Sequence, residues 1–269
     1  MDRLGPFADV FLNVDRGHEE QKSLTAPIES LSLDDAYEIQ RRVIAARTSA
    51  GERVVGYKVG CTSRAIRRQF GLTEPICGRL TSPHVHHGET ALDWHAYRHP
   101  AVEPEFVLII GKDLTDEVGE ADSLRDAIDS VSPGIELHNY RFRFGEPTSQ
   151  ELIASNGLHA GLIVGEREVG ARDFDMDLEG VGLFVNGVLA DSGIGAEIMG
   201  GPLESLRWLV NHLVRRGEAV RAGQIVIPGS PVGLIPVRPG DRVSARFTHV
   251  GQVEALFRGA DAGADQRSL

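Results

Sequence analysis

Short apolar segments bounded by glycine follow one another along most of this chain, and helices do not alternate with them regularly. The clearest are 53–62, 102–110, 134–142 and 157–165, and several more follow residue 225. A doubly wound parallel sheet needs a helix between successive strands, so this order argues against that fold. The 31 glycines gather at the ends of these segments. This pattern predicts a curved antiparallel or mixed sheet.

Two longer segments have apolar residues at helical spacing. Residues 34–50 begin with an acidic turn and are followed by Gly51, and residues 202–216 begin at a proline and are followed by Gly217. These start and stop signals predict two amphipathic helices.

Two shorter signals complete the expected elements. The sequence predicts a short helix over 124–131, and Asn186-Gly187 between apolar runs predicts the turn of a β-hairpin. We therefore expect a helical N-terminal segment over 1–52, a sheet-based catalytic domain over 53–258 and a flexible tail over 259–269.

Composition limits the possible partners and location. The formal net charge of −11 argues against binding nucleic acid or an anionic membrane, because both need a basic surface. The first residues lack the basic start and apolar run of a signal peptide. Cys61 and Cys77 are too few for a disulfide framework, so we expect a cytoplasmic protein.

Two carboxylates stand at the entrance of an apolar run. Glu103 and Glu105 flank a proline just before residues 106–110, and in an extended chain they point to the same side. Taken alone, this pair is typical of a solvated strand end. Glu136 lies in another apolar run, where an unpaired charge would be costly. Three such carboxylates on neighbouring strands suit Mg²⁺ or Mn²⁺.

Lys58 also departs from its surroundings, because it stands alone in the apolar segment "VVGYKVGCT". It fits a strand edge with its head in water. It equally fits an acid/base group whose pKa is adjusted by burial and carboxylates. The run "HVHH" contains His84, His86 and His87; beside proline and glycine it is more typical of an exposed loop than of metal ligands.

Several motifs in order resemble one family. They are G-x-K-x-G-x-T-S over 56–63, "EPICG" over 74–78, E-x-E before an apolar strand, and "PGIE" over 133–136. This order is similar to that of the 2-hydroxypentadienoate hydratase/4-oxalocrotonate decarboxylase family of the fumarylacetoacetate hydrolase superfamily. The likeness runs from about residue 30 to 258.

The resemblance implies an α+β fold, with a mixed β-roll or barrel-like core of the fumarylacetoacetate hydrolase C-terminal type and a helical N-terminal segment. It implies a divalent metal, Mg²⁺ or Mn²⁺, on Glu103, Glu105 and Glu136, with Lys58 as the acid/base group. The side chains expected to contact substrate are Ser155, Thr62, His138 and Ser230.

The chain departs from the family pattern at positions that bear on the reaction. Ile76 stands where hydratases of the family tend to carry aspartate, and losing that carboxylate favours decarboxylation over water addition. Cys77 replaces the usual aromatic residue, and Pro228 stands where threonine is frequent. Arg141 and Arg143 would suit a dicarboxylate if they reach the pocket, and they equally fit a charged surface strand.

We therefore expect a divalent-metal-dependent lyase of aromatic catabolism that acts on a small unsaturated 2-oxo acid. A decarboxylase of the 2-oxo-3-hexenedioate (4-oxalocrotonate) type is slightly preferred to a 2-oxopent-4-enoate-type hydratase. An acylpyruvate C–C hydrolase, with His138 as its base, and a non-catalytic complex subunit remain alternatives. The expected assembly is a homo-oligomer, which could associate with a paired pathway enzyme.

Overall fold

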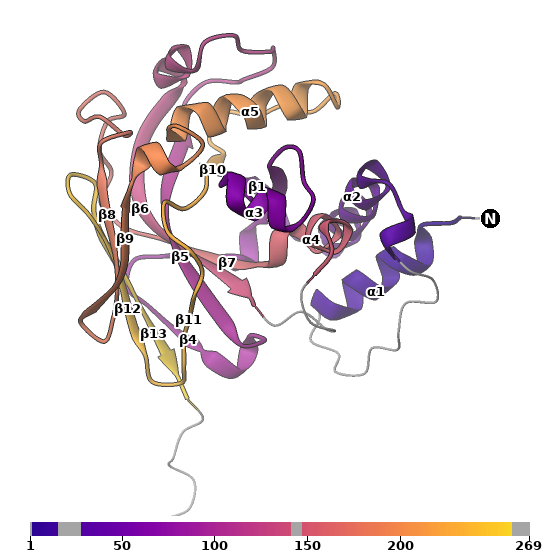
Figure 1. Cartoon of the computed structure of the whole chain (residues 1–269), viewed down its shortest axis with the longest axis horizontal. Coiled ribbons are helices and arrows are strands. Elements are labelled where there is room, and N and C mark those ends of the chain that lie inside the picture. Colours follow the sequence, from indigo (N-terminus) through magenta and orange to yellow (C-terminus); the bar gives the residue numbers. More distant parts are fainter. Residues whose placement is uncertain (1, 16–27, 141–146, 260–269) are drawn as a thin grey trace, which may run out of the picture.

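The computed structural model describes residues 2–15, 28–140 and 147–259, and Figure 1 shows the whole chain. The α-helices are α1 (Gly5–Asp15), α2 (Leu33–Ser49), α3 (Arg64–Gln69), α4 (Ser149–Ala154) and α5 (Pro202–Val214). The strands are β1 (Val54–Gly60), β2 (Ile76–Thr81), β3 (Val85–His87), β4 (Thr90–Asp93), β5 (Pro100–Ile110), β6 (Ile128–Asn139), β7 (His159–Val164), β8 (Gly180–Val185), β9 (Val188–Ile194), β10 (Ile225–Ile227), β11 (Ile235–Pro236), β12 (Arg242–Phe247) and β13 (Gly251–Arg258). Short 3-10 turns link them, among them η4 (Ala121–Ala127) and η5 (Asn156–Leu158).

The larger sheet carries the predicted carboxylates. It has eight strands in the order β2-β1-β10-β5-β6-β7-β3, and β11 pairs with β5. Its neighbours are antiparallel except for the pairs β1 with β10 and β3 with β7. The ladder between β5 and β6 places Glu103 directly opposite Glu136. The expected mixed sheet is confirmed.

The smaller sheet has five strands in the order β4-β13-β12-β8-β9. Strands β8 and β9 form the predicted hairpin, and its turn residues Asn186 and Gly187 have φ values of 52° and 80°. Positive φ at both central residues is what a type I′ turn requires, and asparagine followed by glycine tolerates it best.

The main apolar core lies between the two sheets. Phe106 of β5 and Phe247 of β12 meet edge to face with ring centroids 5.2 Å apart, and both are buried. Because side chains alternate along a strand, the residues of β5 that enter this core leave Glu103 and Glu105 on the opposite face. On that opposite face Val107 packs in a smaller apolar cluster with Leu162 and others.

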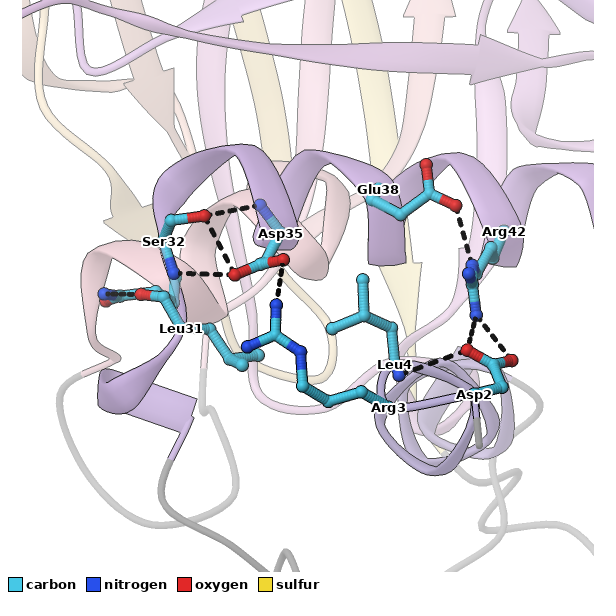
Figure 2. Close-up of polar contacts among 9 residues, drawn as sticks. Asp2, Arg3, Leu4, Leu31, Ser32, Asp35, Glu38 and Arg42 are labelled. Carbon is cyan, nitrogen blue, oxygen red and sulfur yellow. Dashed lines mark hydrogen bonds and ion pairs between the residues drawn. The ribbon is translucent and has the colours of Figure 1, made fainter.

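The N-terminal helices pack together at one side of the larger sheet, whereas the smaller sheet lies on the other side of the molecule (Figure 1). Figure 2 shows how polar contacts hold α1 against α2. Arg42 donates to both carboxylate oxygens of Asp2 at 2.7 Å, and Arg3 donates to Asp35 at 2.6 Å. Asp35 also closes a capping box with Ser32 at the start of α2. The helix predicted over 34–50 is confirmed.

Two local predictions were wrong. Residues 121–127 form the 3-10 turn η4 and residues from 128 onward belong to β6, so no α-helix covers 124–131. The helical spacing misled because this strand is buried on both faces, which removes the alternation that identifies strands. Residues 85–87 form β3, which pairs with β7, so the HVHH run is not simply an exposed loop. In the described ranges, no helix has the length and apolar character needed to cross a membrane.

Candidate functional site

The three predicted carboxylates gather on one face of the larger sheet. Glu103 and Glu105 are alternate residues of β5, and Glu136 faces Glu103 across the ladder to β6. The side chains of Glu105 and Glu136 are almost completely buried, whereas Glu103 is partly exposed. Oxygen Oε2 of Glu105 accepts a hydrogen bond of 3.0 Å from the backbone N–H of Gly229.

Lys58 reaches the same face from β1. Its side chain is buried, and its Nζ lies 2.8 Å from Oε1 of Glu136 and 3.3 Å from the carbonyl oxygen of Gly157. Burial alone would lower the pKa of Lys58, but the negative charge of Glu136, helped by Glu103 and Glu105, raises it above the ordinary value. Of the two interpretations left open by the sequence, the strand edge with its head in water is therefore excluded.

Two buried histidines complete the cluster. His138 follows Glu136 by two residues on β6, and its Nε2 lies 3.0 Å from Oε2 of Glu103 and 3.3 Å from Oε2 of Glu136. His159 starts β7, and its Nδ1 lies 2.7 Å from Oε1 of Glu136. Oε1 of Glu136 therefore contacts Lys58 and His159, and Oε2 faces His138.

The buried carboxylates of the cluster have strongly shifted pKa values. Burial raises the pKa of Glu105 well above its ordinary range, and the charges of Glu136 and Glu103 raise it further. Burial also opposes ionisation of Glu136, but the charges of His138 and Lys58 hold its pKa well below the usual range. A further cation among these carboxylates would favour the ionised form of Glu105.

This donor set fits a divalent cation. Ligand atoms of Glu103, Glu136 and His138 lie within 4.8 Å of one another, and two of these side chains are buried. Carboxylate oxygens and imidazole nitrogen are common ligands of divalent metals. Glu105, the third predicted ligand, stands beside this group. Within the described ranges, the histidines of the HVHH run belong to no such group of three potential ligands.

Thr62 and Ser230 lie near Glu105. A methyl group placed on Gly229 would come within 2.5 Å of Cγ2 of Thr62, so the Thr62 side chain packs against the residue that donates to Glu105. Ser230 is next in sequence, and its Oγ accepts from the N–H of Val232. The structure thus brings both residues to the Glu105 side of the cluster, and substrate contact by them stays a prediction.

Ser155 ends helix α4, and its hydroxyl donates to the carbonyl oxygen of Leu152 at 3.2 Å. It lines a small cavity against α1 and α2. The structure does not bring its hydroxyl to the carboxylates, and its predicted substrate contact remains a prediction. Arg141 and Arg143 lie outside the described residues.

A strained turn borders the ammonium of Lys58. Asn156, Gly157 and Leu158 have φ values of 60°, 68° and 59°, a left-handed run that only glycine adopts without cost. The side-chain amide of Asn156 accepts from the backbone N–H of Arg79 on β2 at 2.7 Å and donates to the carbonyl oxygen of Arg79 at 2.8 Å. The carbonyl of Gly157 is thereby held toward Lys58.

Ile76 is the apolar neighbour of this turn. A methyl group placed on Gly157 would lie 3.1 Å from Nζ of Lys58 and 3.6 Å from Cδ1 of Ile76. Ile76 therefore lines the lysine end of the site, whereas Cys77 points to the other side of the strand and joins the main core. Burial raises the pKa of Cys77 to about 11, so this thiol is protonated at neutral pH.

Sequence reasoning missed His159 and Asn156. His159 is an isolated histidine in the apolar segment 157–165, and the same rule that singled out Lys58 applies to it. Asn156 carried no signal, since its role depends on the left-handed backbone and on the distant strand that it clamps.

The chain belongs to the fumarylacetoacetate (FAA) hydrolase C-terminal family, whose model matches residues 71–258. It is 30% identical over 227 residues to a 2-keto-4-pentenoate hydratase of Paraburkholderia xenovorans (strain LB400), covering 84% of each chain. It is 32% identical over 225 residues to a 4-oxalocrotonate decarboxylase of a Pseudomonas species, covering 84% of this chain and 87% of the relative.

A solved structure agrees over nearly the whole molecule. The 4-oxalocrotonate decarboxylase from Pseudomonas putida G7, complexed with magnesium and adipate, matches with a TM-score of 0.90. The match covers 95% of this chain and 97% of that one at 27% identity. The α+β fold with helices at its N-terminus, expected from the sequence, is confirmed, as is the family resemblance.

Proposed function

We propose that this protein is a divalent-metal-dependent lyase of small unsaturated 2-oxo acids. The observation that carries the proposal is the buried contact between Lys58 and Glu136 beside two further carboxylates on one sheet face. A soluble fold gains little from burying so many charges, and removing one partner of such a group is costly. Clusters of this kind are typical of catalytic sites. Relatives of similar sequence are 2-keto-4-pentenoate hydratases and 4-oxalocrotonate decarboxylases.

The side chains divide the chemistry between them. Glu103, Glu105 and Glu136 would hold Mg²⁺ or Mn²⁺, and a bound cation of this kind stabilises the enolate of a 2-oxo acid. Lys58 would hold a proton at Nζ and transfer it to or from the substrate carbon. Glu136 and the carbonyl of Gly157 fix the direction of that ammonium.

Decarboxylation is the preferred reaction. Ile76 gives the lysine end of the site an apolar wall, where water addition would need a group that activates water. An apolar wall also favours loss of charged carboxylate as neutral CO₂. The second candidate is the hydratase, because relatives of both kinds have similar identities to this chain. A homo-oligomeric, cytoplasmic enzyme paired with another enzyme of aromatic catabolism remains part of the proposal.

Two substrates separate the reactions. Metal-loaded protein should release CO₂ from 2-oxo-3-hexenedioate, and it should convert 2-hydroxypentadienoate to the 4-hydroxy acid slowly or not at all. The reverse result would establish the hydratase. No turnover of either compound, with metal bound, would favour the acylpyruvate hydrolase or the non-catalytic subunit.

The ligand role of Glu105 has its own test. Glu105→Gln keeps the shape of the side chain and removes the charge, so we expect lower activity together with metal affinity lower by roughly 10-fold or more. Metal content is measured by atomic emission after dialysis, and Glu166→Gln on the loop after β7 is the matched control. Unchanged metal content in the Glu105 variant would contradict the ligand assignment.

A further inference from the structure

The imidazole of His138 contacts two of the predicted metal-binding carboxylates. His138 lies two residues after Glu136 on β6, so both side chains project from the same face. Its side chain is 4% exposed, and its Nε2 faces Glu103 and Glu136. Such a position is expensive for an imidazole unless the ring nitrogens have partners.

The contacts of His138 do not have the geometry of hydrogen bonds. Nε2 is close to two carboxylate oxygens, at 3.0 and 3.3 Å, yet neither contact satisfies hydrogen-bond angles. Across the described part of the chain, Nδ1 also has no hydrogen-bond partner. A buried donor left in this state costs about 1–3 kcal/mol. The nitrogen therefore points between the two oxygens, as a ligand does around a shared cation.

We propose that Nε2 of His138 is a direct ligand of the divalent metal, together with Glu103 and Glu136. This inference rests on the proposed function, since it concerns the same metal centre. It replaces an oxygen-only site with a mixed nitrogen and oxygen site. Glu105, held by the N–H of Gly229, remains the third carboxylate ligand.

The second histidine has a different role. His159 contacts Oε1 of Glu136 at 2.7 Å, and Lys58 contacts the same oxygen. Both orient the carboxylate and leave Oε2 facing His138 and Glu103. Outer partners of this kind fix metal ligands without touching the metal. His159 is thus a positioning residue and gives a matched control for His138.

A nitrogen ligand changes which metal the site prefers. Imidazole nitrogen is a better ligand for first-row transition metals than for Mg²⁺, which takes oxygen ligands and keeps several waters. We therefore expect Mn²⁺ to bind more tightly than Mg²⁺, and the difference to depend on His138.

The experiment measures the nitrogen directly. Protein loaded with Mn²⁺ is studied by electron spin echo envelope modulation, which detects a ¹⁴N nucleus bound to the metal. The wild type should show imidazole ¹⁴N coupling, which His138→Gln should lose and His159→Gln should keep. The preference for Mn²⁺ over Mg²⁺, measured by calorimetry, should fall at least roughly 10-fold in His138→Gln only.

Several outcomes would overturn the inference. Wild-type protein that binds Mn²⁺ without ¹⁴N coupling has an oxygen-only site, which leaves the proposed function intact. If the coupling disappears in His159→Gln and persists in His138→Gln, the nitrogen ligand is His159 and the inference is wrong. Failure of the wild type to bind any divalent cation contradicts both this inference and the proposed function. If His138→Gln does not fold, ¹⁵N-histidine labelling of the wild type and of His159→Gln still decides the result.

Discussion

At the scale of single residues, Lys58 carries the most specific prediction. Lys58→Ala should lower turnover by about 10²–10⁴-fold, because it removes the proposed acid/base group. Metal affinity should be kept or increased, since the ammonium no longer competes for Glu136. Steady-state kinetics and calorimetry measure the two effects, and Lys112→Ala, at an exposed position after β5, is the control. Full turnover in the metal-loaded variant would contradict the assignment.

His212 of α5 makes the stability of the protein depend on pH. Its side chain is completely buried, and burial followed by the charges of Arg216 and Arg215 lowers its pKa from 6.5 to about 3. Below pH 6.5 the unfolded chain binds a proton that the folded protein does not. The free energy of unfolding should therefore fall with decreasing pH, and His212 contributes up to about 1.4 kcal/mol per pH unit.

His212→Phe tests this contribution while filling most of the ring volume between Tyr37 and Trp208. Urea unfolding between pH 7.5 and 5 should show a weaker acid loss of stability in the variant than in the wild type. His95→Phe, at an exposed histidine, should leave the wild-type slope unchanged. Equal slopes for the wild type and His212→Phe would show that the buried imidazole does take up the proton.

At the scale of elements, the site depends on close packing between β2 and the strained turn η5. A methyl group on Gly78 would lie 2.8 Å from Oδ1 of Asn156 and 2.9 Å from Cγ of Lys58. Gly78→Ala should therefore displace both side chains, reduce turnover and lower the free energy of unfolding by about 1–3 kcal/mol. Urea unfolding and kinetics measure these changes. Gly119→Ala, where the added group meets nothing within 4 Å, is the control, and identical behaviour would contradict the packing argument.

The sequence predicted the longer helices and the hairpin better than it predicted the start of β6 and the pairing of β3. The helices α2 and α5 and the hairpin of β8 and β9 have local start, stop and turn signals, and all three are confirmed. The start of β6 was misread because its pattern is set by burial on both faces. The short strand β3 exists only through its pairing with β7, and no local signal reports such a pairing.

The site was predictable in part for the same reason. Glu103, Glu105 and Lys58 broke local rules, so the sequence singled them out. That Glu136 lies opposite Glu103 follows from the ladder register, and that His159 joins Glu136 follows from the next strand. Both contacts join residues that are distant in the sequence, so no local pattern predicts them. Family resemblance supplied the roles, and physical pattern alone would have left a solvated strand end as the leading interpretation.

At the scale of the whole molecule, strand β9 predicts self-association. It forms the edge of the smaller sheet, and Val188 and Ile194 on it are 70% and 42% exposed. An exposed apolar edge strand is a site for pairing with another strand, and a second copy of this chain is the expected partner. Light scattering after size-exclusion chromatography should show an oligomer for the wild type and smaller species for Val188→Lys. A monomeric wild type at micromolar concentration would contradict this expectation.

The wide sequence separation of paired strands has a consequence for how the protein is made. Lys58 sits on β1, and β1 pairs with β10 in a register that joins Lys58 to Ile227. Likewise, β4 pairs with β13 near the other end of the chain. Loops this long must close before either ladder forms, which slows folding and exposes unpaired edges meanwhile. A ribosome must therefore synthesise residue 227 before Lys58 is held on both sides, by Gly78 of β2 and by Ile227 of β10. Nascent chains stalled before residue 225 should be bound by chaperones and digested readily by protease.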